Sequence, residues 1–405
     1  MAPHADKPAA GFQWAQLFAL SGVHFVVDML AAILPPILPT IRQEFSLSLS
    51  VAGSVIVVLM LTANGVQILS GSTRANKRKP TLLSLGLLLI VSVCFIAPLS
   101  ELNLGLTGLI VLALISGCGI AVTHPESLRA VHALDAIPSA VSTSIFMTGG
   151  YLGFAGAGAV STLLVSNYGL SGLYLLALLP VLGVVLLYLL RIRMAVESDQ
   201  PARKAPRPGE KVLPFWLVLL MALPAATSIT VLVALLPTML SEFGFELTFG
   251  GYSSTLYALG AAAGAYVWGS LGHKKGELRC CIAAFLMTIP FLVVYFLLAR
   301  HRWAVWLLFG AGFCSIPAYV LIITLARSAA GLSLGLRMGL VIGGTWGVAN
   351  LAFMGLAVVA DRVGTAPVIK TTVLGFPLSA AFGLYLLLKY KPKPLRTAHN
   401  PILQD

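Results

Sequence analysis

Residues 38–45, which read LPTIRQEF, recur as LPTMLSEF at residues 236–243. The two copies agree at Leu, Pro, Thr, Glu and Phe with an offset of 198 residues. Glycines keep this offset, or one of 194, in the pairs Gly53 and Gly251, Gly71 and Gly269, Gly149 and Gly343, and Gly150 and Gly344. Chance matches would not hold nearly one register across loops and the segment between them. The repeat therefore indicates that the chain consists of two related halves.

The composition of the chain is that of a membrane protein. Of its 405 residues, 58% are apolar and only 10% are charged, with a mean hydropathy of +0.94, whereas a soluble chain carries about 25% charged residues. Apolar stretches of roughly 20 residues recur along the sequence, and a helix of that length crosses a ~30 Å hydrocarbon layer. They lack the period-2 alternation of barrel strands. A water-soluble enzyme is excluded, and the predicted fold is an all-α membrane protein.

Twelve such stretches define the predicted architecture, two pseudo-symmetric halves of six transmembrane helices each. The predicted spans are 14–38, 49–70, 80–98, 104–122, 139–165, 171–190, 214–239, 249–270, 279–298, 303–324, 336–359 and 367–388. They divide the chain into an N-terminal half (1–190), a polar linker (191–213), a C-terminal half (214–390) and a tail (391–405). Two parallel six-helix halves around a midplane site are typical of the major facilitator fold.

The basic charge is distributed asymmetrically between the predicted loops. If the N-terminus is cytoplasmic, 21 of the 26 Lys and Arg residues fall on the cytoplasmic side. The far side keeps five, namely Arg42, Arg300, Arg302, Arg362 and Lys370. This positive-inside pattern predicts that both termini are cytoplasmic and explains the net charge of +12 without a nucleic-acid partner.

His24 and Asp28 are the most informative polar residues. Their i, i+4 spacing places them on one face of the first span, near its middle. A carboxylate there is costly unless it lines water or takes up a proton. At the offset of 198 both positions are alanine in the second half (Ala222 and Ala226), so the repeated fold requires neither charge. We predict that Asp28 and His24 couple transport to protons; a buried structural pair is the alternative.

A second polar group occurs at residues 123–129 (THPESLR), at the inner end of the fourth span. Pro125 is expected to bend or end the helix. His124, Glu126 and Arg129 are predicted to line a substrate vestibule, although Glu126 and Arg129 could also form a simple i, i+3 surface pair. Other polar candidates for a cavity are Asn64, Gln67, Tyr319, Trp346 and Asn350. Each alone is more often an interhelical hydrogen bond or a packing element.

No catalytic residue, metal site or cofactor is predicted. The five cysteines lie in apolar spans without the spacing of metal ligands. Residues 331–335 match G-x-S-x-G but lie between two membrane helices and not on a strand-to-helix turn. The sequence contains no H-E-x-x-H and no P-loop, so a membrane metalloprotease or an ATP-driven pump lacks its machinery.

Three stretches carry a more specific resemblance. Residues 21–29 (SGVHFVVDM), 123–127 (THPES) and 144–150 (SIFMTGG, followed by Gly153) look like the corresponding parts of the fosmidomycin resistance proteins, bacterial members of the major facilitator superfamily. The resemblance implies a proton-driven exporter of the inner membrane for small drug-like substrates, anionic ones among them. By position it marks His24, Asp28, His124, Glu126 and Arg129.

Together these observations predict efflux of small molecules by proton antiport and alternating access. Uptake of an organic anion or nutrient by symport stays open, because Ala157 and Gly158 stand where such antiporters usually show Gly-Pro. An uncoupled facilitator and a non-transporting scaffold are further alternatives. The expected partners are a small-molecule substrate, protons and the lipid bilayer, with the protein a monomer.

Overall fold

The computed structural model describes residues 10–70, 78–195 and 213–390. In the first two ranges the helices are α1 (Ala10–Ala31), α2 (Leu34–Glu44), α3 (Leu49–Ser70), α4 (Thr81–Ile90), η1 (Val91–Cys94), α5 (Pro98–Glu101), α6 (Gly105–Val131), α7 (Ser139–Tyr168), η2 (Gly169–Leu173) and α8 (Tyr174–Leu189). In the third they are α9 (Phe215–Glu242), α10 (Leu247–Lys275), α11 (Glu277–Leu298), η4 (Arg302–Val305), α12 (Trp306–Ser328), α13 (Leu334–Gly339), η5 (Leu340–Gly344), α14 (Thr345–Val363), α15 (Thr365–Lys370), η6 (Thr371–Leu374) and α16 (Gly375–Tyr390).

Every predicted span coincides with one helix or with consecutive helical segments. Within the described residues, nine helical stretches have the length and composition to cross a membrane, and Thr81–Cys94 is a shorter apolar helix. One of the nine, Val141–Leu189, covers α7 from Val141 onward and all of α8. The all-helical, multi-pass class predicted from composition therefore holds, while the count of twelve crossings stays a prediction. The tail 391–405 and linker residues 196–212 lie outside the described residues.

The first predicted span is broken in two. α1 ends at Ala31 and α2 begins at Leu34, with Pro35 and Pro36 in its first turn. Proline has no backbone N–H to donate and is well tolerated in the first turn, where those groups have no helical acceptor. The break therefore lies where the two prolines start a new helix, and α2 then continues to Glu44, beyond the predicted end of the span.

The eleventh predicted span contains a wide turn. Between α13 and α14 the backbone forms the π-helical segment η5, Leu340–Gly344. The Tyr319 hydroxyl of α12 donates a hydrogen bond to the carbonyl oxygen of Val341 in this segment. Such turns interrupt the regular i to i−4 bonding of a helix and often occur at functional sites.

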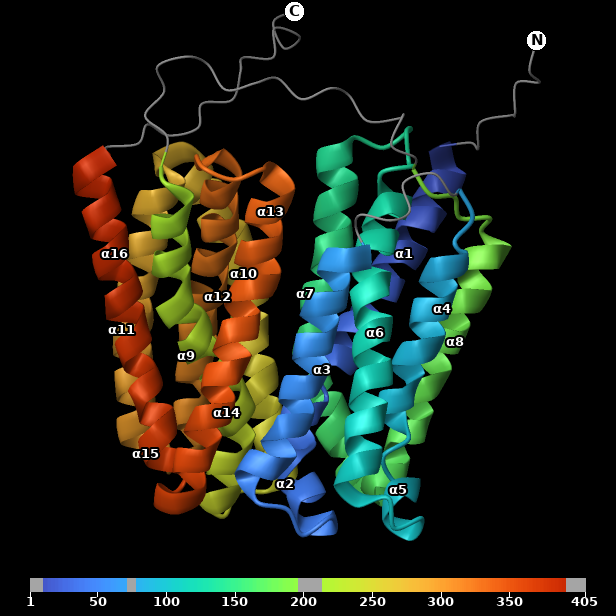
Figure 1. Ribbon diagram of the computed structural model, residues 1–405, viewed down its shortest axis with the longest axis vertical. Helices are drawn as coiled ribbons and strands as arrows, with labels where there is room; N and C mark the ends of the chain where they lie inside the picture. The colour runs from blue at the N-terminus through green and yellow to red at the C-terminus, as the bar shows by residue number, and fades with distance from the viewer. Residues whose placement is uncertain (1–9, 71–77, 196–212, 391–405) are drawn as a thin grey trace, which may run out of the picture.

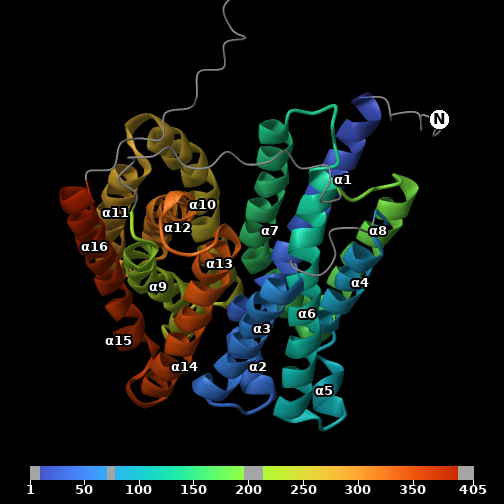
Figure 2. The same ribbon diagram turned by 45° about the horizontal axis from the view of Figure 1, so that its top comes forward.

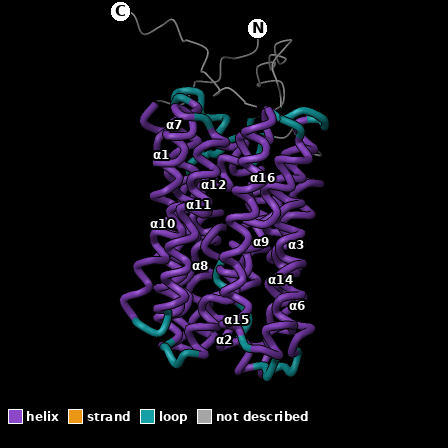
Figure 3. Tube along the Cα trace, turned by 90° about the vertical axis from the view of Figure 1, so that its left-hand side faces the viewer, coloured by secondary structure: helices purple, strands orange, loops and turns teal. Residues whose placement is uncertain are grey.

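The helices gather in two groups, α1–α8 on one side and α9–α16 on the other (Figure 1). The 45° view shows the same division from above (Figure 2), and helices run the length of the molecule with loops confined mainly to its ends (Figure 3). The groups touch where α7 packs against α10, α3 against α14, and α2 against α9. The core of each group is built from buried aliphatic and aromatic side chains.

Two close contacts between the groups lie toward one end of the molecule. α7 and α10 cross at Gly158 and Gly251, where a Cβ on either glycine would overlap the backbone oxygen of the other. At the start of α3, Asp361 of α14 accepts hydrogen bonds from the backbone N–H groups of Leu49 (2.7 Å) and Ser50 (2.9 Å). In Figure 1 this end lies opposite the start of α1 and the end of α16.

Candidate functional site

His24 and Asp28 lie midway along the apolar stretch Gly11–Glu44. His24 Nε2 is 3.3 Å from Asp28 Oδ2, so the side chains predicted to share a helical face are in contact. His24 is buried, with 4% of its surface exposed. Asp28 is only partly buried, with 24% of its side chain exposed. The carboxylate is thus accessible from a face of the helix group while its histidine partner is enclosed.

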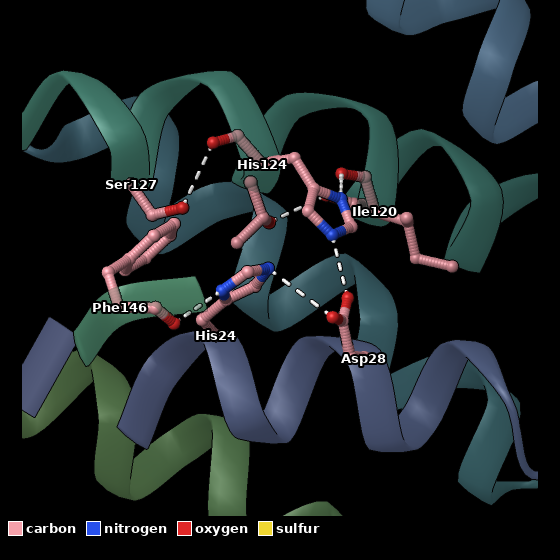
Figure 4. A network of polar contacts seen from close by, with 8 residues as sticks. His24, Asp28, Ile120, His124, Ser127 and Phe146 are labelled. Carbon is pink, nitrogen blue, oxygen red and sulfur yellow. Dashed lines mark hydrogen bonds and ion pairs between the residues drawn. The ribbon is translucent and has the colours of Figure 1, made fainter. Parts of the chain in front are cut away.

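His124 of α6 completes the cluster. Its Nε2 is 2.8 Å from Asp28 Oδ1, so the carboxylate has one imidazole on each oxygen (Figure 4). The sequence predicted that His124 lines a substrate vestibule, and it made no prediction about a contact with Asp28. Pro125 was expected either to bend or to end its helix. It does not end the helix, because α6 continues to Val131. We call His24, Asp28 and His124 the proton cluster.

Backbone carbonyl groups orient both imidazoles. His24 Nδ1 lies 2.9 Å from the carbonyl oxygen of Phe146 in α7, and its ring stacks on the Phe146 ring at a centroid distance of 4.1 Å. His124 Nδ1 lies 3.1 Å from the carbonyl oxygen of Ile120, one turn earlier in α6. Both rings therefore direct Nε2 toward Asp28 (Figure 4).

Glycines of α7 allow the close approach of this helix to α1. An added Cβ at Gly149 or Gly153 would overlap the backbone oxygen of Ser21 or Phe25, respectively. At Gly150 it would overlap Asp28 Oδ2 and lie 2.5 Å from His24 Cε1. The stretch 144–150 that carried the family resemblance therefore forms one wall of the proton cluster.

Two residues at the proton cluster were not singled out in the sequence. Phe146 supplies the carbonyl oxygen and the ring that hold His24. Tyr151, also of α7, follows Gly150, the residue that faces Asp28 and His24. In the sequence, only their position in or beside the 144–150 stretch pointed to these two residues. That position does not indicate which side chains of the stretch reach the cluster.

The proton cluster is also a set of side chains that could hold a metal ion. Among the described residues, the ligand atoms of His24, Asp28 and His124 all lie within 4.8 Å of one another. Two ligand atoms about 2.1 Å from one ion are separated by roughly 3.0–3.4 Å at ordinary bond angles. His124 Nε2 and Asp28 Oδ1 are 2.8 Å apart, which is the spacing of a charge-assisted hydrogen bond. A shared proton fits this contact better than a metal.

Glu126 and Arg129 lie in a different environment. Arg129 Nη1 donates to Glu126 Oε1 at 2.7 Å, and Glu126 is buried. Arg129 Nη2 also donates to the carbonyl oxygen of Ala195 at 2.9 Å, while the Ala195 N–H donates to the carbonyl oxygen of Arg129 at 3.1 Å. The pair thus ties the segment after α8 to the end of α6, a structural contact that the sequence did not predict.

The candidates of the second half form their own group. The Tyr319 ring packs on the Trp346 ring at a centroid distance of 4.7 Å, and Asn350 donates to the carbonyl oxygen of Trp346 at 2.8 Å. Asn64 and Gln67 lie partly buried on α3, which packs against α6 and α14. The structure therefore joins His124 to His24 and Asp28, and groups Tyr319 with Trp346 and Asn350.

The family model of the Major Facilitator Superfamily matches residues 20–341, and the chain belongs to this superfamily. The protein is therefore a multi-pass membrane transporter and not an enzyme. It is 24% identical to the fosmidomycin resistance protein of Escherichia coli (strain K12) over 391 residues, or 94% of this chain and 95% of that protein. It is also 21% identical to the uncharacterized MFS-type transporter YfnC of Bacillus subtilis (strain 168), with 93% of each chain covered.

Solved structures share the fold. A bacterial homologue of the human lysosomal transporter Spinster, in an inward-facing and occupied conformation, superimposes with a TM-score of 0.72 at 15% identity, covering 96% of this chain and all of that one. A bacterial homologue of the iron transporter ferroportin, in an inward-facing state, gives a TM-score of 0.69 at 13% identity, covering 94% and 99% of the two chains. At these identities the likeness concerns the fold alone.

Proposed function

We propose that this chain exports small drug-like molecules, anionic ones among them, across the bacterial inner membrane in exchange for protons. In this proposal twelve helices cross the membrane as two six-helix halves, 1–190 and 214–390, which rock around a central site. Both termini and the linker 191–213 are cytoplasmic, and the protein works as a monomer. One proton entering down ~100 mV contributes about 2.3 kcal/mol, or a gradient of roughly fiftyfold for a neutral substrate.

The single observation that carries this proposal is the proton cluster. A carboxylate flanked by two imidazoles, midway along a membrane-spanning stretch, is an arrangement suited to binding and releasing protons. The repeat adds a second argument, since the positions equivalent to His24 and Asp28 in the second half are Ala222 and Ala226. The cluster is therefore extra to what the fold needs, as expected for a functional site.

Export is favoured by the relative in Escherichia coli, whose name connects it with resistance to fosmidomycin. Symport of an organic anion or a nutrient is the second candidate, because Ala157 and Gly158 replace the Gly-Pro pair usual in such antiporters, and Gly158 lies where α7 meets α10. The residues proposed to contribute to the substrate path are Glu126, Arg129, Asn64, Gln67, Tyr319, Trp346 and Asn350.

The test is transport by the purified protein in liposomes that contain a pH-sensitive dye, with fosmidomycin as the probe. Antiport moves protons out of the compartment that fosmidomycin enters, whereas symport moves them into it. We expect the direction of antiport, and we expect Asp28→Asn, which keeps the side-chain volume but cannot ionise, to abolish the proton movement. Full gradient-driven transport by Asp28→Asn would contradict the assignment of Asp28. Movement of protons in the same direction as fosmidomycin would contradict antiport.

A further inference from the structure

The hydrogen bonds of the two imidazoles fix where each ring carries its proton. A backbone carbonyl oxygen can only accept a hydrogen bond, so each Nδ1 must be the donor. His24 Nδ1 donates to the carbonyl oxygen of Phe146 at 2.9 Å and His124 Nδ1 donates to that of Ile120 at 3.1 Å. In the neutral form of either ring, Nε2 therefore carries a lone pair and no hydrogen.

Both lone pairs point at an acceptor. His124 Nε2 is 2.8 Å from Asp28 Oδ1, and His24 Nε2 is 3.3 Å from Asp28 Oδ2. An ionised carboxylate has no hydrogen to donate. Two lone pairs facing each other at 2.8 Å repel, whereas a proton between them makes a strong charge-assisted bond. The geometry thus has two places for a proton, one on each carboxylate oxygen.

We propose, building on the proton coupling above, that His24, Asp28 and His124 form one two-proton site in which each Asp28 oxygen shares one proton with the Nε2 atom facing it. His124, which the sequence assigned to a vestibule, is then a proton-binding residue. With no shared proton the cluster has a charge of −1, with one it is neutral, and with two it has a charge of +1. With one or two shared protons the cluster is therefore uncharged or cationic.

The two places fill in a definite order. The first proton occupies the contact between His124 and Asp28, because that is the shorter one and because both side chains are about one-quarter exposed. The second occupies the contact with His24, which is enclosed by Phe146. The cluster is thus neutral with one proton, and acidification makes it cationic.

The helices around α1 add one further titratable side chain to the cluster. α6 supplies His124, and α7 supplies Tyr151, the residue after Gly150, which faces the cluster. α4 has no titratable residue, and α8 has only Tyr174 and Tyr188, near its two ends. The phenol of Tyr151 is uncharged at neutral pH. The charge of the cluster therefore depends on its own three members.

The test is the ¹⁵N spectrum of the full-length protein in lipid nanodiscs, labelled at the imidazole nitrogens of its seven histidines. Single His→Asn variants assign the signals. At pH 7 we expect His124 to carry protons on both nitrogens and His24 to be neutral with its proton on Nδ1. At pH 5 we expect both nitrogens of His24 to be protonated as well. A neutral His124 with its proton on Nε2 would overturn the proposal.

Asp28→Asn provides the second arm. Without the carboxylate, His124 should be neutral at pH 7 with its proton on Nδ1; a His124 that stays doubly protonated would also overturn the proposal. The matched control is His132→Asn at the end of α6, an exposed position, which should leave both signals unchanged. Since the spectra need neither substrate nor gradient, the two-proton site and the transport proposal can fail separately.

Discussion

Gly150 of α7 faces the proton cluster where no side chain would fit. A methyl group at this position would overlap Asp28 Oδ2 and lie 2.5 Å from His24 Cε1. We expect Gly150→Ala to push the carboxylate and the imidazole apart, and to slow fosmidomycin-driven proton movement at least about tenfold, because small displacements of reacting groups are costly. The dye-loaded liposomes described above provide the measurement.

The control for this substitution lies on the same helix. At Gly156 an added Cβ would meet only the Phe25 ring, at 3.7 Å, which is an ordinary contact. Gly156→Ala should therefore transport at the wild-type rate. If Gly150→Ala also stays within about twofold of wild type while its fold is intact, the close fit at Gly150 is unimportant to the site.

The residues of the cluster differ in how far the sequence could reveal them. His24 and Asp28 are four residues apart on a helix, so their contact follows from helical geometry alone. The contact of Asp28 with His124 joins residues 96 positions apart. It depends on how α1 and α6 are rotated against each other, which apolar periodicity does not specify. Glu126 and Arg129 pair as their spacing suggests, but the bond from Arg129 to Ala195 had no signal in the sequence.

At the scale of helices, Asp361 links α14 to α3. It accepts from the first two backbone N–H groups of α3, which have no acceptor within their own helix. We expect Asp361→Ala to cost about 0.5–2 kcal/mol of stability, as other lost helix caps do. It should also widen the distribution of distances between spin labels on Glu44 and Val363, measured after the five native cysteines are replaced.

The repeat supplies a control for Asp361. At the offset of 194 its counterpart is Asn167 on α7, and at the offset of 198 Leu247, at the start of α10, corresponds to Leu49. Asn167 donates to the carbonyl oxygen of Leu163 in its own helix. Asn167→Ala should therefore leave the thermal unfolding temperature almost unchanged. Equal losses from both substitutions would show that Asp361 has no special role in joining the helices.

Helices were easier to predict than their interruptions. α3 spans the predicted 49–70, because a continuous apolar run of membrane-spanning length has few alternatives. The break before α2 coincides with Pro35 and Pro36. The hydropathy of the span does not indicate it, because the stretch is apolar on both sides of the break. Pro224 and Pro237 lie inside α9 without ending it. Whether a proline breaks a helix depends on the neighbours that satisfy the freed carbonyl group, and those are tertiary contacts.

At the scale of the whole molecule, the ends of the two helix groups predict the topology. The start of α1, the end of α8, the start of α9 and the end of α16 lie at one end of the molecule (Figure 1). Because 21 of 26 basic residues favour the cytoplasm, we expect reporter fusions within 191–213 and at the C-terminus to be cytoplasmic. A fusion at 299–301, between α11 and η4, is the control and should report the far side. Opposite locations for the first two fusions would contradict an even number of crossings between them.

The repeat predicts two related halves, and the helices form two groups, α1–α8 and α9–α16 (Figure 1). It does not predict which helices meet between the groups. α7 and α10 meet at Gly158 and Gly251, two glycines among the 39 of the chain. Small residues permit a close crossing, but many pairs of small residues are available. Which pair forms the crossing depends on how the whole facing surfaces of the two helix groups fit together.

The position of the proton cluster along the chain also bears on how the protein is made. His24, Asp28 and His124, the carbonyl groups that orient them and Gly150 all lie between residues 24 and 150. Since domains fold as units and the N-terminal part folds first during synthesis, we expect the partly buried Asp28 carboxylate to meet both imidazole partners before α9 leaves the ribosome. In that case the translocon would release a first half in which Asp28 already has its hydrogen-bond partners, and the second half would assemble onto it without supplying any.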